Sequence, residues 1–163
     1  MREALLWRGW ACGGEWNMSI FKRLKADHEL QRRLAERIMQ TSGDSPDRRD
    51  AFATLKREIE AHASAEEQSL YATMMALPAG QPKARHSTAE HKEAADILEE
   101  LTQLEMSSGA WLRRFEHLKQ RLEHHLDEEE REIFPAANKL LSSSDVTDLA
   151  VIFDERKALK LKD

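Results

Sequence analysis

The chain has 163 residues, of which 34% are charged and 6% aromatic, and its formal net charge is −5 at pH 7. This length fits one domain with a sizeable core, and the negative charge argues against nucleic acid or an anionic membrane surface as a partner. No apolar run approaches the roughly 20 residues that a membrane-spanning helix requires. The one cysteine, Cys12, excludes an intramolecular disulfide and fits a reducing environment. We therefore expect a single-domain cytoplasmic protein.

The first 17 residues differ in composition from the rest of the chain. They contain three of the four tryptophans and the only cysteine. Arg8 interrupts their apolar stretch, so the segment lacks the apolar core of roughly 7–15 residues that a signal peptide needs. Residues 1–17 are predicted to be a loose N-terminal extension, and Met18 is an alternative candidate for the start of translation.

From residue 18 onward, apolar residues recur at helical spacing and nowhere alternate as in a strand. A first helix is predicted over residues 19–40. A second begins after Ser45, because the serine hydroxyl can cap a helix that has Pro46 in its first turn, and it ends before Pro78. A third helix is predicted over residues 82–106.

The fourth helix repeats the apolar pattern of the second and is expected to kink or to lose its regularity at Pro135, which lacks a backbone donor. Residues 142–144 are expected to be a linker. They precede a shorter amphipathic helix over about 145–160. This last helix is expected to cover the end of the bundle, and a homodimer contact is the alternative.

The predicted core positions repeat at an interval of 63 residues: Phe52 corresponds to Phe115 and Leu55 to Leu118. Each half is thus a helical hairpin. Two hairpins with short connections predict an all-α fold, an antiparallel up-down-up-down four-helix bundle with a short C-terminal helix. The predicted parts are the N-terminal extension (1–17), the bundle (18–143) and the C-terminal helix (144–163).

The same repeat carries histidines and glutamates. In each half a histidine is followed 34 residues later by a His-x-x-x-Glu pair that continues the apolar stripe of its helix. Residues four apart lie one above the other on a helix, so each pair can converge on one ion. Burying these carboxylates without partners would cost several kcal/mol. We therefore predict a buried metal site with six ligands: His28, His62, Glu66, His91, His125 and Glu129.

Two further pairs have the same spacing, His86–Glu90 and His124–Glu128. They lie on the polar faces of their helices and are expected to be exposed. His86 ranks behind the six as an additional ligand, and His124 ranks lower still.

Six ligands, two of them carboxylates that can bridge, are too many for a tetrahedral zinc site and suit two ions. Histidine with carboxylate is the mixture that non-haem iron favours. A single octahedral ion and a structural network of imidazolium and carboxylate groups are the alternatives. The spacing does not distinguish iron from manganese, cobalt or zinc.

These residues resemble the hemerythrin-like, or HHE cation-binding, family in its four-His, two-Glu bacterial type. The resemblance covers about residues 18–141 and includes the segments 27–29, 66–71, 90–92 and 129–135. It implies a di-iron centre with two oxo- or hydroxo-bridged iron ions, and zinc and manganese remain alternatives. It also implies that Glu66 and Glu129 bridge the ions. His28 and His62 would then cap one ion, and His91 and His125 the other.

One departure from the family bears on function. Oxygen-carrying hemerythrins have two histidines four residues apart on the third helix, whereas here Ser87 and Ala95 occupy the positions four before and four after His91. The resemblance therefore implies an open position at one iron. Such a position favours reaction with small oxidants over reversible storage of dioxygen.

The leading expectation is a protein that binds and reacts with peroxide, dioxygen or nitric oxide, and catalase-like peroxide disproportionation is the most concrete reaction. The alternatives are a non-catalytic oxygen or nitric oxide sensor, an iron donor in stress repair of iron centres, and a bundle that metal merely stabilises. The sequence shows no nucleophile arrangement, phosphate-binding glycine loop or basic patch that would indicate another activity.

Overall fold

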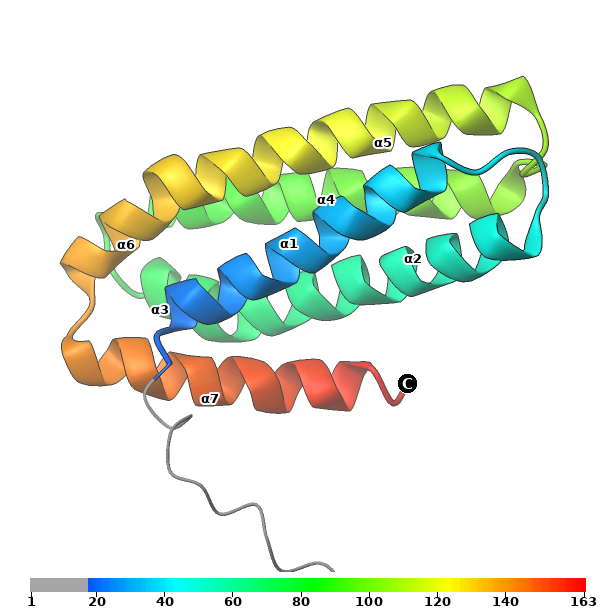
Figure 1. Ribbon diagram of the computed structural model, residues 1–163. Helices are drawn as coiled ribbons and strands as arrows, with labels where there is room; N and C mark the ends of the chain where they lie inside the picture. Colours follow the sequence, from blue (N-terminus) through cyan, green and yellow to red (C-terminus); the bar gives the residue numbers. More distant parts are fainter. Residues whose placement is uncertain (1–17) are drawn as a thin grey trace, which may run out of the picture.

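In the computed structural model (Figure 1), which describes residues 18–163, each of four helical segments runs antiparallel to the next. The predicted N-terminal extension, residues 1–17, lies outside the described residues. The segments are α1 (Ile20–Met39); α2, η1 and α3 (Pro46–Glu66, Glu67–Tyr71, Ala72–Met75); α4 (Gln81–Gln103); and α5, η2 and α6 (Gly109–Glu128, Glu129–Ile133, Phe134–Leu140). A fifth segment, α7 (Ser143–Lys160), follows. The predicted all-α bundle is confirmed.

Serine side chains cap the start of four of these helices. Ser19, Ser45 and Ser108 each accept a hydrogen bond from a backbone N–H three residues later. Ser142 does the same for α7, and Asp145 bonds back to the Ser142 backbone to complete a capping box. These bonds satisfy donors that a helix start leaves free, so the serines define where the helices begin.

Each half contains a π turn directly at its predicted bridging glutamate. Segment η1 begins immediately after Glu66, and η2 begins at Glu129. The N–H of Ala72 bonds to the carbonyl of Glu67, and that of Phe134 to the carbonyl of Glu129, five residues back. The regular helix therefore ends at Glu128, earlier than Pro135. The chain continues helically through Pro135, which lies in the first turn of α6.

Two apolar clusters fill the bundle. One lies toward the α1–α2 and α4–α5 connections and includes Trp111 and Phe115. The other lies toward the opposite end and includes Leu24, Leu70 and Phe153. In each of the four bundle segments the predicted metal ligands lie at the boundary between the two clusters, so apolar side chains flank the site on both sides.

The C-terminal helix was expected to cover the end of the bundle, but it does not. It lies along the side, against α1, α2 and η1 (Figure 1). The predicted linker is also shorter, because α7 already begins at Ser143 with Ser142 as its cap. The buried positions Leu149, Ala150 and Phe153 explain this placement, since they join the apolar cluster beside α1 and η1.

Within residues 18–163, no helix has the length and apolar character needed to cross a membrane.

Candidate metal centre

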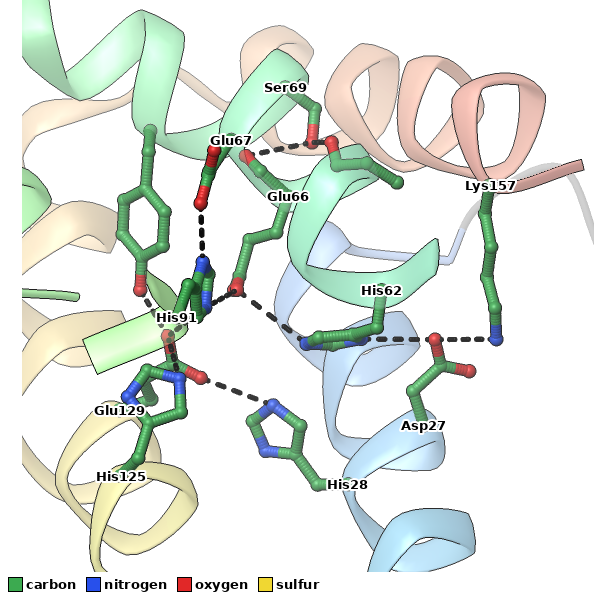
Figure 2. Close-up of polar contacts among 12 residues, drawn as sticks. Asp27, His28, His62, Glu66, Glu67, Ser69, His91, His125, Glu129 and Lys157 are labelled. Atoms are coloured by element: carbon green, nitrogen blue, oxygen red, sulfur yellow. Dashed lines mark hydrogen bonds and ion pairs between the residues drawn. The ribbon is translucent and has the colours of Figure 1, made fainter. Parts of the chain in front are cut away.

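The six predicted ligands meet in the middle of the bundle (Figure 2). They come from all four segments: His28 from α1, His62 and Glu66 from α2, His91 from α4, His125 from α5 and Glu129 from η2. Both carboxylates are completely buried, and the four imidazoles are at most 8% exposed. The helical repeat therefore brings together the residues that it relates in the sequence.

The two glutamates reach imidazoles from both halves of the chain. Glu129 places Oε2 3.2 Å from Nε2 of His28 and Oε1 3.3 Å from Nε2 of His125. Glu66 places Oε2 3.5 Å from Nε2 of His62 and 3.4 Å from Nε2 of His91. Ligand atoms that share an ion at about 2.1 Å lie roughly 3–3.5 Å apart. The measured separations match that spacing.

The atoms fall into two groups that could each hold an ion. His28 and His62 form one group with Glu129, and His91 and His125 form the other with the same glutamate. Within each group the ligand atoms lie within 4.8 Å of one another. This is the pairing that the family resemblance implies. The role of each residue as a ligand stays a prediction.

The inward-facing polar atoms lack a well-aligned hydrogen bond among the described residues, although the imidazole and carboxylate atoms lie 3.2–3.5 Å apart. They are Nε2 of His28, His62, His91 and His125, both carboxylate oxygens of Glu66, and Oε2 of Glu129. Buried polar groups are nearly always hydrogen-bonded, and each one left unsatisfied costs roughly 1–3 kcal/mol. A set of such atoms on six residues that face one another fits metal cations as the missing partners.

The outward-facing nitrogen of each histidine is bonded to a carboxylate. The Nδ1 distances are 2.8 Å from His28 to Glu130, 3.0 Å from His62 to Asp27, 2.9 Å from His91 to Glu67, and 2.8 Å from His125 to Glu90. Such a carboxylate fixes the ring and places the proton on Nδ1, which leaves the Nε2 lone pair directed inward. All four imidazoles are thus oriented for metal binding.

The sequence analysis did not identify these four carboxylates, although the repeat contained a signal for them. Asp27 and Glu90 correspond across the two halves, as do Glu67 and Glu130. Each stands directly beside a predicted ligand, on the adjoining polar face. An acid conserved between the halves at these positions could have been assigned to the imidazole of a neighbouring helix.

The imidazoles and carboxylates of the centre shift one another's pKa values. Burial lowers the pKa of His28 and of His91, but contacts with Glu129 and Glu130, and with Glu66 and Glu67, raise these values to about 9 and about 10. Burial opposes the charge of the Glu66 carboxyl, yet His62 and His91 hold its pKa well below the usual range. Metal must therefore compete with protons for the imidazoles, so its binding releases protons.

Comparison with known proteins agrees with this geometry. The family model described as hemerythrin HHE cation binding domain matches residues 19–137. The chain belongs to this family. The fold is similar to that of a hemerythrin HHE cation binding domain-containing protein from Mycobacterium kansasii, with a TM-score of 0.80 and 23% identity over 89% of this chain and 88% of that one. No curated protein matches the sequence significantly. Family membership implies that the HHE domain binds metal cations.

The two halves of the HHE domain differ beside the carboxylates. Tyr71 donates a hydrogen bond from its hydroxyl to Oε1 of Glu129, whereas the corresponding Phe134 packs against His28 with ring centroids 5.7 Å apart. Burial, together with the charges of Glu129 and Glu66, raises the pKa of Tyr71 well above its ordinary value. The phenol therefore stays protonated and remains a donor.

His86 does not reach the buried centre. Its side chain is 51% exposed, and Nε2 lies 2.9 Å from Glu128 Oε2 on α5. The structure therefore places this lower-ranked candidate outside the group formed by the other six.

Helix α7 holds one of the outer carboxylates in place. Lys157 Nζ lies 2.8 Å from Asp27 Oδ2 and 2.7 Å from Glu58 Oε2, and Arg23 Nη1 lies 2.7 Å from Asp27 Oδ1. Figure 2 shows the resulting chain from Lys157 through Asp27 to His62. The ring of Phe153 packs 5.5 Å from that of His62. The helix thus supports His62 from outside the four-helix bundle.

Replacing Lys157 with alanine should destabilise the protein by about 3 kcal/mol, because it removes one of the two cations at the buried Asp27 carboxylate and the ion pair of Glu58. The side chain of Lys157 is only 9% exposed. Lys160, which is 45% exposed on the same helix, is the matched control, and its alanine variant should change stability by less than about 0.5 kcal/mol. Urea denaturation measures both. Equal midpoints for the two variants would show that the buried ion pair is not stabilising.

Proposed function

We propose that the HHE domain binds two iron ions between His28, His62, Glu66, His91, His125 and Glu129 and reacts there with small oxidants, of which peroxide is the most concrete. The observation that supports this best is the set of buried, unpartnered nitrogen and oxygen atoms on these residues. The reaction is disproportionation of peroxide to water and dioxygen.

Two ions fit this arrangement better than one. Glu129 directs its two oxygens at histidines from different halves, and each half-centre has its own pair of imidazoles. The mixture of imidazole and carboxylate is one that non-haem iron favours. When bound, a pair of iron ions supplies a centre that can exchange two electrons, as peroxide disproportionation requires.

A small residue beside His91 supports access for a small molecule. Ser87 lies one turn before His91 on α4, is completely buried, and has no hydrogen-bond partner for Oγ within the described chain. The short side chain cannot reach an ion as an imidazole would. A ligand position on this side would therefore be left for a substrate.

A surface pocket approaches the same side of the centre. It has a volume of about 530 Å³, and its lining includes Glu67, Tyr71, Arg85 and Lys92. Glu67 is the residue that orients His91, and Tyr71 is bonded to Glu129. A small oxidant that enters this pocket is therefore separated from the ligands by one layer of side chains, in which Tyr71 is a donor.

Replacing Tyr71 with phenylalanine should slow peroxide loss about tenfold and leave the iron content unchanged. A hydrogen bond to a charged acceptor contributes roughly 1.5–3 kcal/mol. The Tyr71 hydroxyl would make such a bond to a bound oxidant, and phenylalanine cannot. Met75→Leu, which changes another residue of the pocket, is the control and should keep the original rate. Oxygen evolution with parallel iron analysis measures both effects. A wild-type rate in Tyr71→Phe would exclude a role for the hydroxyl.

The proposal is tested by metal analysis and peroxide turnover on protein from iron-replete cells. Two irons per chain, near-ultraviolet absorption that changes on adding azide, and dioxygen evolution from peroxide would support it. Zinc as the only metal would contradict it. Two irons without peroxide turnover would exclude the catalase-like activity, and a non-catalytic sensor or iron donor would be tested next, by iron transfer to an apo iron–sulfur protein.

A further inference from the structure

Two His-x-x-x-Glu pairs outside the buried centre face each other across α4 and α5. His86 Nε2 lies 2.9 Å from Glu128 Oε2 and 3.6 Å from Glu90 Oε2. His124 Nε2 lies 4.0 Å from Glu128 Oε2, one turn earlier on α5. His86, Glu90 and Glu128 therefore converge at the surface, with ligand atoms within 4.8 Å of one another, and His124 approaches this group at Glu128. Each pair taken alone belongs to an ordinary polar helix face.

We propose that His86, Glu90, His124 and Glu128 form a second, solvent-facing site for a divalent transition metal, through which metal enters the buried centre. Imidazole with carboxylate suits Fe²⁺, Co²⁺ and Zn²⁺. Donor atoms around a tetrahedral ion of this kind lie roughly 3.3–3.5 Å apart. The distances from His86 to Glu128 and to Glu90 bracket that value, and His124 is the fourth candidate donor because its Nε2 already lies 4.0 Å from Glu128 Oε2.

The surface group is connected to the centre through Glu90. Its Oε2 faces His86 and lies 2.8 Å from Nδ1 of the predicted ligand His125. The side chain of Glu90 is only 8% exposed, whereas those of His86 and His124 are 51% and 61% exposed. Glu90 thus lies between the exposed imidazoles of the surface group and the buried imidazole of His125.

Arg121, the cation beside Glu90, pairs with the other carboxylate oxygen of that residue. Arg121 Nη2 lies 2.8 Å from Glu93 Oε2 and 3.4 Å from Glu90 Oε1. It therefore holds the oxygen of Glu90 that points away from His86. Oε2, shared by His86 and His125, is the one directed into the proposed site.

The first half of the bundle lacks an equivalent group. The repeat relates His86 to Arg23, His124 to Ala61 and Glu128 to Ala65. There the outer carboxylate Asp27 is covered by Arg23 and by Lys157 of α7. A cation approaching that side meets two positive charges, whereas the second half offers two exposed imidazoles. The asymmetry favours entry beside His125.

Zinc binding to the surface site can be measured without knowing what the buried centre holds. Equilibrium dialysis of the protein as purified against Zn²⁺, with all metals measured, should show one additional Zn²⁺ per chain. His86→Asn/His124→Asn should lose this ion and keep its original metal. His117→Asn, at an exposed histidine two turns earlier on α5, should retain it. No additional ion in the wild type, or the same ion in the double variant, would overturn the site.

The entry role rests on the proposed function and has its own readout. Chelator-stripped protein is mixed with Fe²⁺, and the appearance of iron that resists a fast chelator is followed. His86→Asn/His124→Asn should fill about tenfold more slowly than His117→Asn and reach the same final content. The factor takes the low end of the 10–100-fold change in affinity or activity that follows loss of an outer group of a metal site. Equal filling rates would overturn the entry role. A lower final content would show instead that the histidines support the centre itself.

Discussion

Replacing Glu129 with glutamine is expected to remove both metal ions from the HHE domain. This carboxylate belongs to both ligand groups and directs one oxygen toward His28 and the other toward His125. An amide keeps the shape of the side chain but has one oxygen fewer and no charge to offset the cations. Elemental analysis should find less than about one fifth of the wild-type metal. Mutating a group that only holds a ligand in place already costs 10–100-fold in metal affinity, and loss of a ligand itself should cost more. Peroxide loss should fall with it.

The matched control is Glu132→Gln, three residues further along η2 on the exposed face. It removes the same charge from the same segment and should keep full metal content. A Glu129→Gln protein that retains both ions would contradict the bridging role. Retention of one ion would assign Glu129 to a single ion and leave Glu66 as the shared ligand.

Stripping the metal from the HHE domain should lower its melting temperature by roughly 8–16 °C. A ligand at 1,000 times its dissociation constant stabilises the folded state by about 4 kcal/mol, and each kcal/mol corresponds to roughly 2–4 °C in a domain of this size. Without metal, the inward atoms of all six residues lose their partners. Calorimetry with and without chelator measures the difference. An unchanged melting temperature would mean that the carboxylates and imidazoles satisfy one another, as in a purely structural network.

The difference in melting temperature between the metal-bound and the metal-free protein should increase with pH. In the metal-free chain the pKa values of His28 and His91 are raised from 6.5 to about 9 and about 10. Their protonation therefore contributes stability that is fully present below pH 6.5 and is lost as the pH rises through 9–10. Metal requires the neutral imidazoles and gains affinity over the same range. The gap in melting temperature should be larger near pH 9 than near pH 6, and a constant gap would show that these imidazoles do not exchange protons for metal.

Sequence periodicity alone predicted the bundle, because the 63-residue repeat relates core residues such as Phe52 and Phe115. It also brought the six candidate ligands together, since a histidine and a glutamate that continue an apolar stripe must face inward. Spacing along one helix was sufficient for these assignments. The fold is thus confirmed, whereas the role of the six residues as metal ligands stays a prediction.

What periodicity missed depends on contacts between helices. The position of α7 against the bundle could not be predicted, because its apolar stripe fits the side of the bundle as well as the end. The contact between Lys157 and Asp27 joins residues far apart in the sequence, which periodicity does not reveal. His86 and His124 were correctly expected to be exposed, but the expectation was wrong for Glu90, which is buried, and Glu128 is half-buried. Their meeting depends on the register between α4 and α5, which neither helix specifies by itself. The π turns likewise have no simple apolar pattern.

Two of the four outer carboxylates are exchanged between the hairpins. Glu130 from the second hairpin orients His28 of the first, and Glu67 from the first orients His91 of the second. Neither hairpin alone holds two correctly oriented imidazoles with a complete set of carboxylates. During folding, each hairpin can form its own helices, but tight metal capture has to wait until the hairpins dock. The ions should then bind late and stabilise the assembled bundle, and they should not nucleate its folding.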